Sequence, residues 1–518
     1  MAPKTSFTVR NVATVCLLIG CIVFYAIYMP YQPKTTNFEG PNLNGFELLD
    51  MESKATAPPL ETLKNIDKNA LSDIIKPLEY PIKVYIKALQ RSVRVLTVPR
   101  GKMLNQALQD CEKYRQPPLI NHQHSLEFRF PYALSQMQAI ARKHNKPQYD
   151  FLYENTTTEP LFYFLQSYQY YIVYCSYDKR NKESWVTSDR YINKLATYTI
   201  NTKDFKRNAG LDFMVPASHP KSGPMGAKYT DQGIYQRQAF LRTDMDWNGY
   251  TPKDIIVPYY VPITPPTVTI MRPLLRLPVT SLQIAGAINK IAPPPDPVAQ
   301  DSWFLFFAGG KNPPGGLREQ LEKAIDELAR TEHLRDIIFT TSAYTREQFS
   351  HGLHHSVFCA SVRGDTASSS RLFAVIEAGC IPVIISDWMP LPFSDIIDYT
   401  KFSVRFPESI VHDVRQLVTH LRAIPSEQVR AMQAAVRTAR TLLVYPPNSQ
   451  VTEYYLLNPV TLTLVEMFMR RKEYCDGLDK ADLARPTRLR KAIGSAGVSE
   501  MSNMCSKLYT RLRQALMA

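Results

Sequence analysis

One stretch of the chain combines strand and helix patterns with three consecutive serines. Val357–Ala360 is apolar and predicts a buried strand, and Ile381–Ile385 predicts a second one. Between them, Ser368–Ser370 offer N-caps for a helix that Gly379 would end. The residues therefore predict a strand, a loop, a helix and another strand in close succession.

The loop before this helix is the point where a phosphorylated ligand could bind. A helix that begins at the carboxyl end of a strand presents free N–H groups and a positive partial charge to such a ligand. Arg363 and Arg371 flank this point, and Ser369 and Ser370 adjoin Arg371. Cations and backbone donors could stabilise the diphosphate that leaves when a nucleotide sugar reacts, without a metal. Glu377 could accept hydrogen bonds from ribose or sugar hydroxyls; the alternative is an exposed helix carboxylate.

The elements that must position these residues alternate between strands and helices, which is typical of mostly parallel sheets covered by helices. Before residue 260, strands are predicted at residues 80–86, 151–153, 161–164, 211–215 and 254–257, and helices at 132–143 and 184–197. Ten prolines lie between Pro258 and Pro297, so this segment cannot be a central strand or a helix interior. We therefore expect a domain boundary near Pro297.

A second α/β region follows this boundary. Strands are predicted at residues 303–308 and 337–340, a helix at 317–328, and helices again after Ser426. The region from 470 to 513 is rich in Lys and Arg, which favours a solvated helix face over an acceptor-binding patch.

The N-terminus predicts a membrane anchor. Residues 12–29 carry no charge and approach the ~20 residues that a spanning helix needs. Lys4 and Arg10 precede them, so the N-terminus should stay cytosolic and the bulk of the chain should face the lumen. A cleaved signal peptide is the alternative, but the apolar run exceeds the usual ~7–15 residues of such peptides.

Charge and cysteine content agree with a luminal protein that binds anions. The net charge of +14 favours a nucleotide diphosphate, an acidic glycan or a phospholipid surface. Nucleic acid is not expected, because no aromatic-basic RNA-binding box is present. Asn155 begins an Asn-Thr-Thr glycosylation pattern. Six cysteines outside the anchor are compatible with disulfides, whose pairing the sequence leaves open: Cys111, Cys175, Cys359, Cys380, Cys475 and Cys505.

The stretch from Ser356 to Val404 resembles the signature of the exostosin-like glycosyltransferases, family 47. The matching motifs are S-x-FC, RGD, SSRLF, AGCIPVIISD, LPFSD-x-ID and FSV. Weaker similarities occur at Lys253–Pro258, at Phe306–Gly309 and at Ile424-Pro425 with Met432, so the resemblance covers residues 80 to 470.

The resemblance implies a GT-B fold, in which two Rossmann-like domains face a cleft, and an inverting Golgi enzyme of type II topology. The expected layout is a cytosolic tail (1–11), a transmembrane signal-anchor (12–29), a stem (30–78), an N-terminal Rossmann-like acceptor-side domain (79–297), a C-terminal Rossmann-like nucleotide-sugar-binding domain (298–470) and a basic helical tail (471–518). The resemblance also implies that Gly309 and Arg318 lie at the nucleotide sugar, where Arg318 could neutralise phosphate; for Arg318 the alternative is a surface arginine.

Two positions depart from the family pattern. Ala374 stands where the family commonly has an acidic residue, and Phe213 replaces a histidine next to Asp212. An inverting transferase needs a base at the acceptor hydroxyl, and Asp212 and His219 are the candidates. For each, a structural role is the alternative.

Three short motifs are discounted. Asp244-Met245-Asp246 has the DxD spacing of metal-dependent transferases, but two acids so close arise readily by chance. His351 and His354 could share a helix face, yet no third metal ligand is apparent. Arg363-Gly364-Asp365 is interpreted as a loop.

We therefore expect a Golgi membrane glycosyltransferase that transfers a sugar, from a UDP-sugar, to a polysaccharide or to a glycoprotein or proteoglycan glycan. No metal cofactor is expected, with a divalent ion as the alternative; the nucleotide sugar is the cosubstrate. The expected partners are the glycan acceptor, the membrane and, in a homo- or hetero-oligomer, other transferases. The alternative function is a catalytically inactive relative that binds glycan or acts as a scaffold for another transferase.

Overall fold

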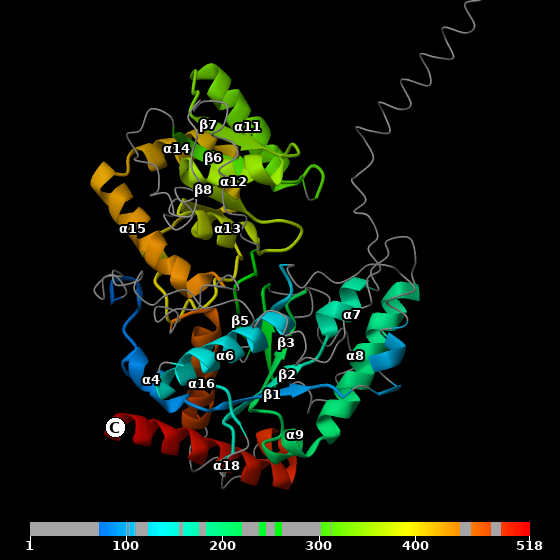
Figure 1. Cartoon of the computed structure of the whole chain (residues 1–518). Coiled ribbons are helices and arrows are strands. Elements are labelled where there is room, and N and C mark those ends of the chain that lie inside the picture. The colour runs from blue at the N-terminus through cyan, green and yellow to red at the C-terminus, as the bar shows by residue number, and fades with distance from the viewer. Residues whose placement is uncertain are drawn as a thin grey trace, which may run out of the picture. The chain divides into compact units, whose positions relative to one another are not determined.

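A computed structural model describes ten stretches of the chain (Figure 1). They are residues 72–99, 101–109, 123–154, 159–175, 183–219, 238–244, 254–261, 302–445, 457–477 and 488–518, apart from 103, 108, 144 and 312. The expected anchor at residues 12–29, most of the expected stem and Asn155 lie outside them. Within these stretches, no helix is both long enough and apolar enough to cross a membrane.

The first sheet has five parallel strands in the order β1-β2-β3-β4-β5. They are β1 (Val93–Thr97), β2 (Phe162–Gln166), β3 (Phe213–Pro216), β4 (Ala239–Arg242) and β5 (Ile255–Ile256). Strands β2, β3 and β4 are buried along their whole length, as expected for a parallel sheet covered on both faces. The helices in this half are α4 (Ile82–Ala88), α6 (Leu126–Lys143), η2 (Pro147–Tyr149), α7 (Gln169–Cys175), α8 (Glu183–Asn201) and α9 (Lys203–Arg207).

The second sheet is also parallel, with the order β10-β9-β8-β6-β7. Its strands are β6 (Trp303–Ala308), β7 (Ile337–Thr340), β8 (Ser356–Val362), β9 (Ile381–Ile385) and β10 (Val404–Phe406). Its helices are α11 (Leu317–Thr331), α12 (Arg346–His354), α13 (Arg371–Ala378), η6 (Tyr399–Lys401), η7 (Glu408–His412), α14 (Val414–Arg422) and α15 (Ser426–Leu443). The chain adds β7 on one side of β6 and then β8 on the other. The strand order therefore reverses between β6 and β8, and ligands of such sheets bind outside the carboxyl ends of the strands at this reversal.

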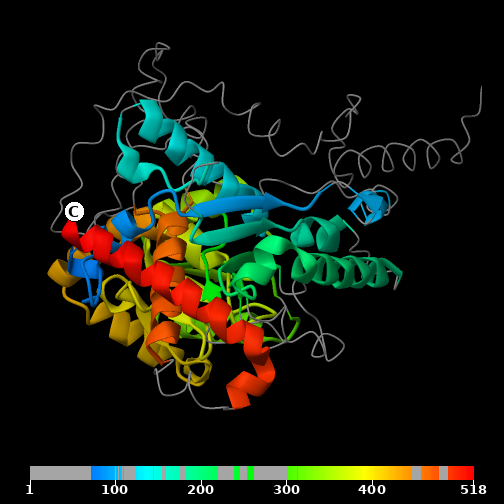
Figure 2. The same ribbon diagram turned by 90° about the horizontal axis from the view of Figure 1, so that it is seen from below.

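The last helices return to the first half of the chain. Helix α16 (Pro459–Gly477) packs against α4, α6 and β5, and α18 (Arg488–Met517) packs against α4 and α16. Figure 2 shows α18 in red beside α16 in orange. A disulfide between Cys475 and Cys505 joins these two helices.

A second disulfide joins Cys359 in β8 to Cys380, which directly precedes β9. It encloses helix α13 and the loop before it. The expectation of disulfides is thus confirmed for four cysteines. Cys111 and the side chain of Cys175 lie outside the described part of the chain.

The expected first strand at residues 80–86 is wrong. This segment forms helix α4 after Pro81, and the first strand is β1 at Val93–Thr97. The β-branched and aromatic residues of α4 bury one face: Tyr85 and Ile86 are buried where α4 packs on α16 and α18. Tertiary packing here overrides the local strand preference.

The remaining element predictions hold better. Residues 151–153 make only an isolated bridge, Val93 with Leu152, whereas β2, β3 and β5 overlap the predicted strands. In the second half, the strands predicted at 303–308, 337–340 and 381–385 are confirmed with the predicted limits. Two parallel sheets covered by helices confirm the α/β class.

Candidate anion-binding and catalytic site

Arg371 is the first residue of α13 and lies at the carboxyl ends of β6 and β8. Its guanidinium group lies so close to Gly309 that a Cβ built on this glycine would be 2.4 Å from Nη2. Its Cζ is 4.8 Å from the centroid of the Phe307 ring and 5.5 Å from that of Phe349. The side chain is therefore enclosed by the end of β6, by α12 and by its own helix.

Within the described stretches, this guanidinium group has no carboxylate partner, and its buried Nε has no hydrogen-bond acceptor. Burial first, and then the charge of Arg318, lower the pKa of Arg371 to about 9. Both effects penalise a cation that lacks an anion beside it. An anionic ligand at this position would remove the penalty, so the geometry is that of an anion site.

Arg318, in the first turn of α11, supplies the second positive charge. Its Nε donates to the carbonyl oxygen of Arg363 at 3.0 Å, Nη1 to that of Gly310 at 3.1 Å and Nη2 to that of Val362 at 3.0 Å. Burial lowers the pKa of Arg318. Since its donors are engaged by carbonyl groups, Arg318 joins the loops that follow β6 and β8, and its charge lies close to Arg371.

Arg363 is paired with a carboxylate. Its Nε donates to Glu408 Oε2 at 2.7 Å, and Glu408 Oε1 accepts a 3.3 Å hydrogen bond from the backbone N–H of Asp387. The charge of Arg363 is therefore balanced, and the side chain braces the loop after β9. A contact with phosphate, as predicted from the sequence, would compete with this ion pair.

The two serines directly before α13 differ in their hydrogen bonds. Ser369 Oγ accepts from the backbone N–H of Arg371 at 3.4 Å. Ser370 occupies the N-cap position, but its side chain makes no capping hydrogen bond. Gly379 ends the helix with φ of 80°, as predicted. The N–H groups in the first turn of α13 are thus engaged within the helix start: that of Arg371 by Ser369 Oγ, and those of Leu372 and Phe373 by the carbonyl oxygens of Ser369 and Ser370.

Glu377 lies at the opposite end of α13. Six residues of helix place it about 9 Å along the axis from Arg371, and its Oε1 accepts from Arg440 Nη2 of α15 at 2.8 Å. The structure therefore does not bring Glu377 to the anion site. Its contact ties α13 to α15.

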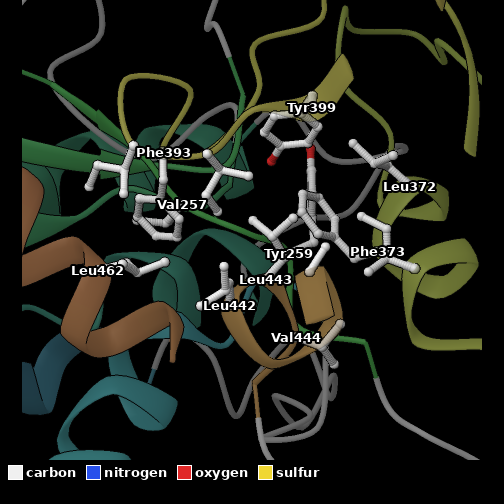
Figure 3. Packing of buried hydrophobic residues seen from close by; sticks show 14 of the residues in the cluster. Val257, Tyr259, Leu372, Phe373, Phe393, Tyr399, Leu442, Leu443, Val444 and Leu462 are labelled. Carbon is white, nitrogen blue, oxygen red and sulfur yellow. The ribbon is translucent and has the colours of Figure 1, made fainter. Parts of the chain in front are cut away.

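Tyr259, which follows β5, brings the first half of the chain to this site. Its hydroxyl group lies 2.6 Å from Ser368 Oγ, and its ring centroid is 6.0 Å from that of Phe373. Figure 3 shows Tyr259 beside Phe373 and Leu443 in the buried cluster. Burial raises the pKa of Tyr259 well above its usual value, so the hydroxyl group stays protonated at neutral pH.

His124 lies next to Tyr259, and His219 lies next to His124. His219 follows the carboxyl end of β3 and is partly exposed. Its ring centroid is 5.0 Å from that of His124, which is 5.4 Å from the Tyr259 ring. His124 could not be predicted from the sequence, because 94 residues separate it from Ser218 and no local motif links them.

The partners of His124 indicate a neutral imidazole. Nδ1 lies 2.5 Å from the carbonyl oxygen of Ser218, which can only accept a hydrogen bond. Nε2 lies 3.2 Å from Gln123 Nε2, which can only donate. This assignment follows from the partners. With both ring nitrogens engaged, His124 orients the segment that carries His219.

Asp212 lies at the amino ends of the strands of the first sheet, opposite the carboxyl ends that carry His219. It directly precedes β3, is 0% exposed, and accepts a 2.5 Å hydrogen bond from Asn208 Nδ2. Burial raises its pKa to about 6, against the opposing effect of Asn208. The carboxyl ends of the strands carry His219 and Arg371, so Asp212 and the anion site are on different sides.

Within the described stretches, no group of three His, Cys, Asp or Glu side chains could hold a metal ion. Asp244 is buried, and Asp246 lies outside the described residues. The rings of His351 and His355 stack at a centroid distance of 3.9 Å, and His354 Nδ1 lies 2.8 Å from the Ser350 carbonyl oxygen. These histidines are engaged within their own helix.

Two parallel sheets covered by helices, with a strand reversal in the second, define a protein of the doubly wound α/β class. Comparison with known proteins gives the family. Residues 168–422, about half of the chain, match the Exostosin GT47 domain, so this part of the chain is similar to the exostosin-like glycosyltransferases of family 47. The predicted resemblance is thereby confirmed.

The curated relatives match in part of their length. The probable arabinosyltransferase ARAD1 of Arabidopsis thaliana is 27% identical over 272 residues, which cover 52% of this chain and 54% of that protein. Human exostosin-2 is 38% identical over 85 residues, or 16% of this chain and 11% of that protein. The chain thus spans about half the length of the first relative and about a tenth of the second. Among solved structures, MurG of Acinetobacter baumannii is 9% identical with a TM-score of 0.26, over 69% of this chain and 96% of that one.

Proposed function

We propose that this protein is a glycosyltransferase that moves a sugar from a UDP-sugar to a glycan of a polysaccharide, glycoprotein or proteoglycan. The observation that carries the proposal is the buried guanidinium group of Arg371, which has no carboxylate partner in the described stretches. It lies where a sheet of this order binds its ligand. The family and the names of its relatives support the same class of reaction.

The donor diphosphate would lie against Arg371, Gly309 and the first turn of α13, with Ser369 and Ser370 beside it. Arg318 would add positive potential without giving up its carbonyl contacts. Charge that develops on the leaving diphosphate would be stabilised by these groups. This arrangement is our reason for proposing chemistry without a metal and a GT-B arrangement, with Rossmann-like domains at 79–297 and 298–470.

His219 is the proposed general base, and Asp212 is the less favoured candidate. In an inverting transfer, the base takes the proton of the acceptor hydroxyl, the freed oxygen bonds to the anomeric carbon, and the bond from this carbon to the diphosphate breaks. His219 lies on the side of Tyr259 and Ser368, whereas Asp212 is fully buried at the opposite edge of its sheet.

We also propose a Golgi membrane location with type II topology. The uncharged run at residues 12–29 supports the anchor. The Cys359–Cys380 and Cys475–Cys505 disulfides support an oxidising lumen for the folded part. Association with a second transferase, or with another copy, is part of the same proposal.

Two substitutions relative to the family pattern favour a second candidate function, that of a catalytically inactive relative. Ala374, where the family commonly carries an acid, is buried on α13. Phe213, in place of a histidine, packs between Tyr163 and Phe205 at ring distances of 5.1 and 5.2 Å. Neither position can supply a polar group. A silent relative that binds glycan or acts as a scaffold for another transferase would tolerate both changes.

Nucleotide binding separates the two candidates. The full chain, purified in detergent, is screened by thermal shift against UDP, GDP, UDP-arabinose and UDP-glucuronic acid, with and without manganese. A ligand that binds only the folded state raises the melting temperature by mass action. Stabilisation by a uridine nucleotide without metal supports the transferase; no shift with any nucleotide supports the scaffold.

A further inference from the structure

Trp388 is a large aromatic side chain that the fold leaves in solvent. It is 76% exposed, although Ser386 before it and Met389 after it are buried. Tryptophan side chains are normally buried over most of their surface. The indole is thus held in solvent on a short exposed stretch, Asp387-Trp388, between buried residues, which calls for a function.

The loop that carries Trp388 is held by several hydrogen bonds. Arg405 Nη2 donates to the carbonyl oxygens of Ser386 at 3.1 Å and of Asp387 at 3.0 Å. The backbone N–H of Glu408 donates to Asp387 Oδ1 at 2.9 Å. The indole is therefore presented by an ordered backbone, so that little conformational entropy would be lost when a ligand stacks on it.

The same loop adjoins the loop that leads to Arg371. Trp388 follows the carboxyl end of β9, on the same edge of the sheet as the anion site. Ser386 Oγ donates to the carbonyl oxygen of Ala367 at 3.2 Å. Glu408 contacts both Arg363 and the backbone of Asp387. Trp388 thus lies on a loop that is joined to the loop before Arg371, and its side chain is outside the buried part of the proposed donor site.

We propose that the Trp388 indole is the stacking platform for a sugar ring of the acceptor glycan. The C–H groups on one face of a pyranose or furanose carry small positive charges and meet the electron-rich face of an aromatic ring. The proposal deepens the proposed function and rests on it, since an acceptor is needed only if the protein transfers sugar.

The acceptor suits this position better than the donor does. The cation that would hold the donor diphosphate is enclosed by Phe307, Phe349 and Gly309, so the donor occupies a buried site. A glycan chain that extends beyond its reacting end lies over the protein surface. An exposed ring on a rigid loop next to the donor site matches such a chain.

The test compares the full-length wild type with Trp388→Ala, Trp388→Tyr and, as a matched control, Tyr198→Ala on α8, whose side chain is 39% exposed. Binding to immobilised arabinan, xylan and heparosan hexasaccharides is measured together with the UDP-induced thermal shift. Removal of an anchoring aromatic from a binding surface typically weakens affinity roughly tenfold or more. We expect that loss for Trp388→Ala on whichever hexasaccharide the wild type binds.

Trp388→Tyr should stay within about threefold of wild type, because the aromatic face is kept. Tyr198→Ala should bind as wild type, and all variants should keep the UDP shift. Unchanged glycan affinity in Trp388→Ala overturns the inference, as does a wild type that binds none of the hexasaccharides. Loss of the UDP shift in Trp388→Ala also overturns it and assigns the indole to the nucleotide base. The proposed function fails by a different result, the absence of any nucleotide shift in the wild type.

Discussion

The guanidinium group of Arg371 lies against the backbone of Gly309, where β6 ends and α13 begins. A Cβ built on Gly309 would be 2.4 Å from Nη2 and 2.6 Å from Cζ. Real Cβ atoms do not come this close to other heavy atoms, so the arginine occupies this position only because residue 309 has no side chain. Glycine at position 309 therefore allows the guanidinium group to approach the backbone closely.

Gly309→Ala should therefore displace Arg371 and weaken UDP binding at least tenfold, which is about the value of one charge-assisted hydrogen bond. Overpacking should also destabilise the protein by about 1–3 kcal/mol. Gly310→Ala is the matched control, because a Cβ there would have nothing within 4 Å. Isothermal titration with UDP decides between them. Equal affinities for both variants would contradict the close approach.

His219→Asn should lower the rate of sugar transfer by about 100-fold or more while UDP still binds, since general-base catalysis typically contributes that much. Asp212→Asn should retain most of the transfer rate, because Asp212 is buried at the other edge of its sheet. Transfer is measured as UDP released in the presence of acceptor. If Asp212→Asn lost more of the transfer rate than His219→Asn, Asp212 would be the base instead.

Glu127, in the first turn of α6, should make stability depend on pH. The carboxylate is fully buried and accepts a 2.9 Å hydrogen bond from the backbone N–H of Tyr171; burial raises its pKa to about 8 from 4.5. The folded state thus keeps a proton that the unfolded state releases between pH 4.5 and 8. The free energy of unfolding should fall as pH rises through this window, by at most about 1.4 kcal/mol per pH unit from this group.

Glu127→Gln keeps the acceptor oxygen and removes the titration. Urea unfolding at pH 5, 6, 7 and 8 should show a shallower decline for the variant than for the wild type. Asp212 and Glu466, whose pKa values burial raises to about 6 and about 7, keep part of the slope in both proteins. Parallel curves for the two proteins would show that Glu127 is charged in the folded state.

The Cys359–Cys380 disulfide closes a loop of 21 residues around α13. The double variant Cys359→Ala, Cys380→Ala should lose about 3 kcal/mol of unfolding free energy, from the constraint that the disulfide places on the unfolded chain. Urea denaturation measures the loss, and thiol titration of unfolded wild type without reductant should leave both cysteines unreactive. Reactive thiols at residues 359 and 380 would contradict this pairing.

The sequence predicts the second half of the fold better than the first. The limits of β7 and β9 agree with prediction because each is a short apolar run with a clear break in the pattern beside it, at Asp336 before β7 and at Gly379 and Ser386 around β9. Residues 80–86 have the same composition but form a helix, since α16 and α18 provide a surface for one helical face. Those helices come from the other end of the chain, so the local sequence pattern at residues 80–86 cannot predict that they pack there.

Some residues of the candidate site could likewise be predicted from the sequence and others could not. Arg371 and Gly309 stand in motifs and were predicted, although their mutual contact was not. Glu377 was assigned to the site on its helix alone, and only the position of Arg440 shows that it is engaged elsewhere. His124 lies near His219 because the segment after β3 is hydrogen-bonded to the segment before α6, through Ser218 and His124, which spacing along the chain does not indicate.

The most direct test of the account is the UDP-induced thermal shift of Arg371→Met beside that of Arg335→Met, an exposed arginine before β7. Methionine keeps much of the side-chain volume and removes the charge. Without ligand, Arg371→Met should melt at or above the wild-type temperature, because a buried cation without an anion is costly. With UDP, the wild type and Arg335→Met should be stabilised and Arg371→Met should not. A UDP shift of wild-type size in Arg371→Met would contradict the assignment of the anion site.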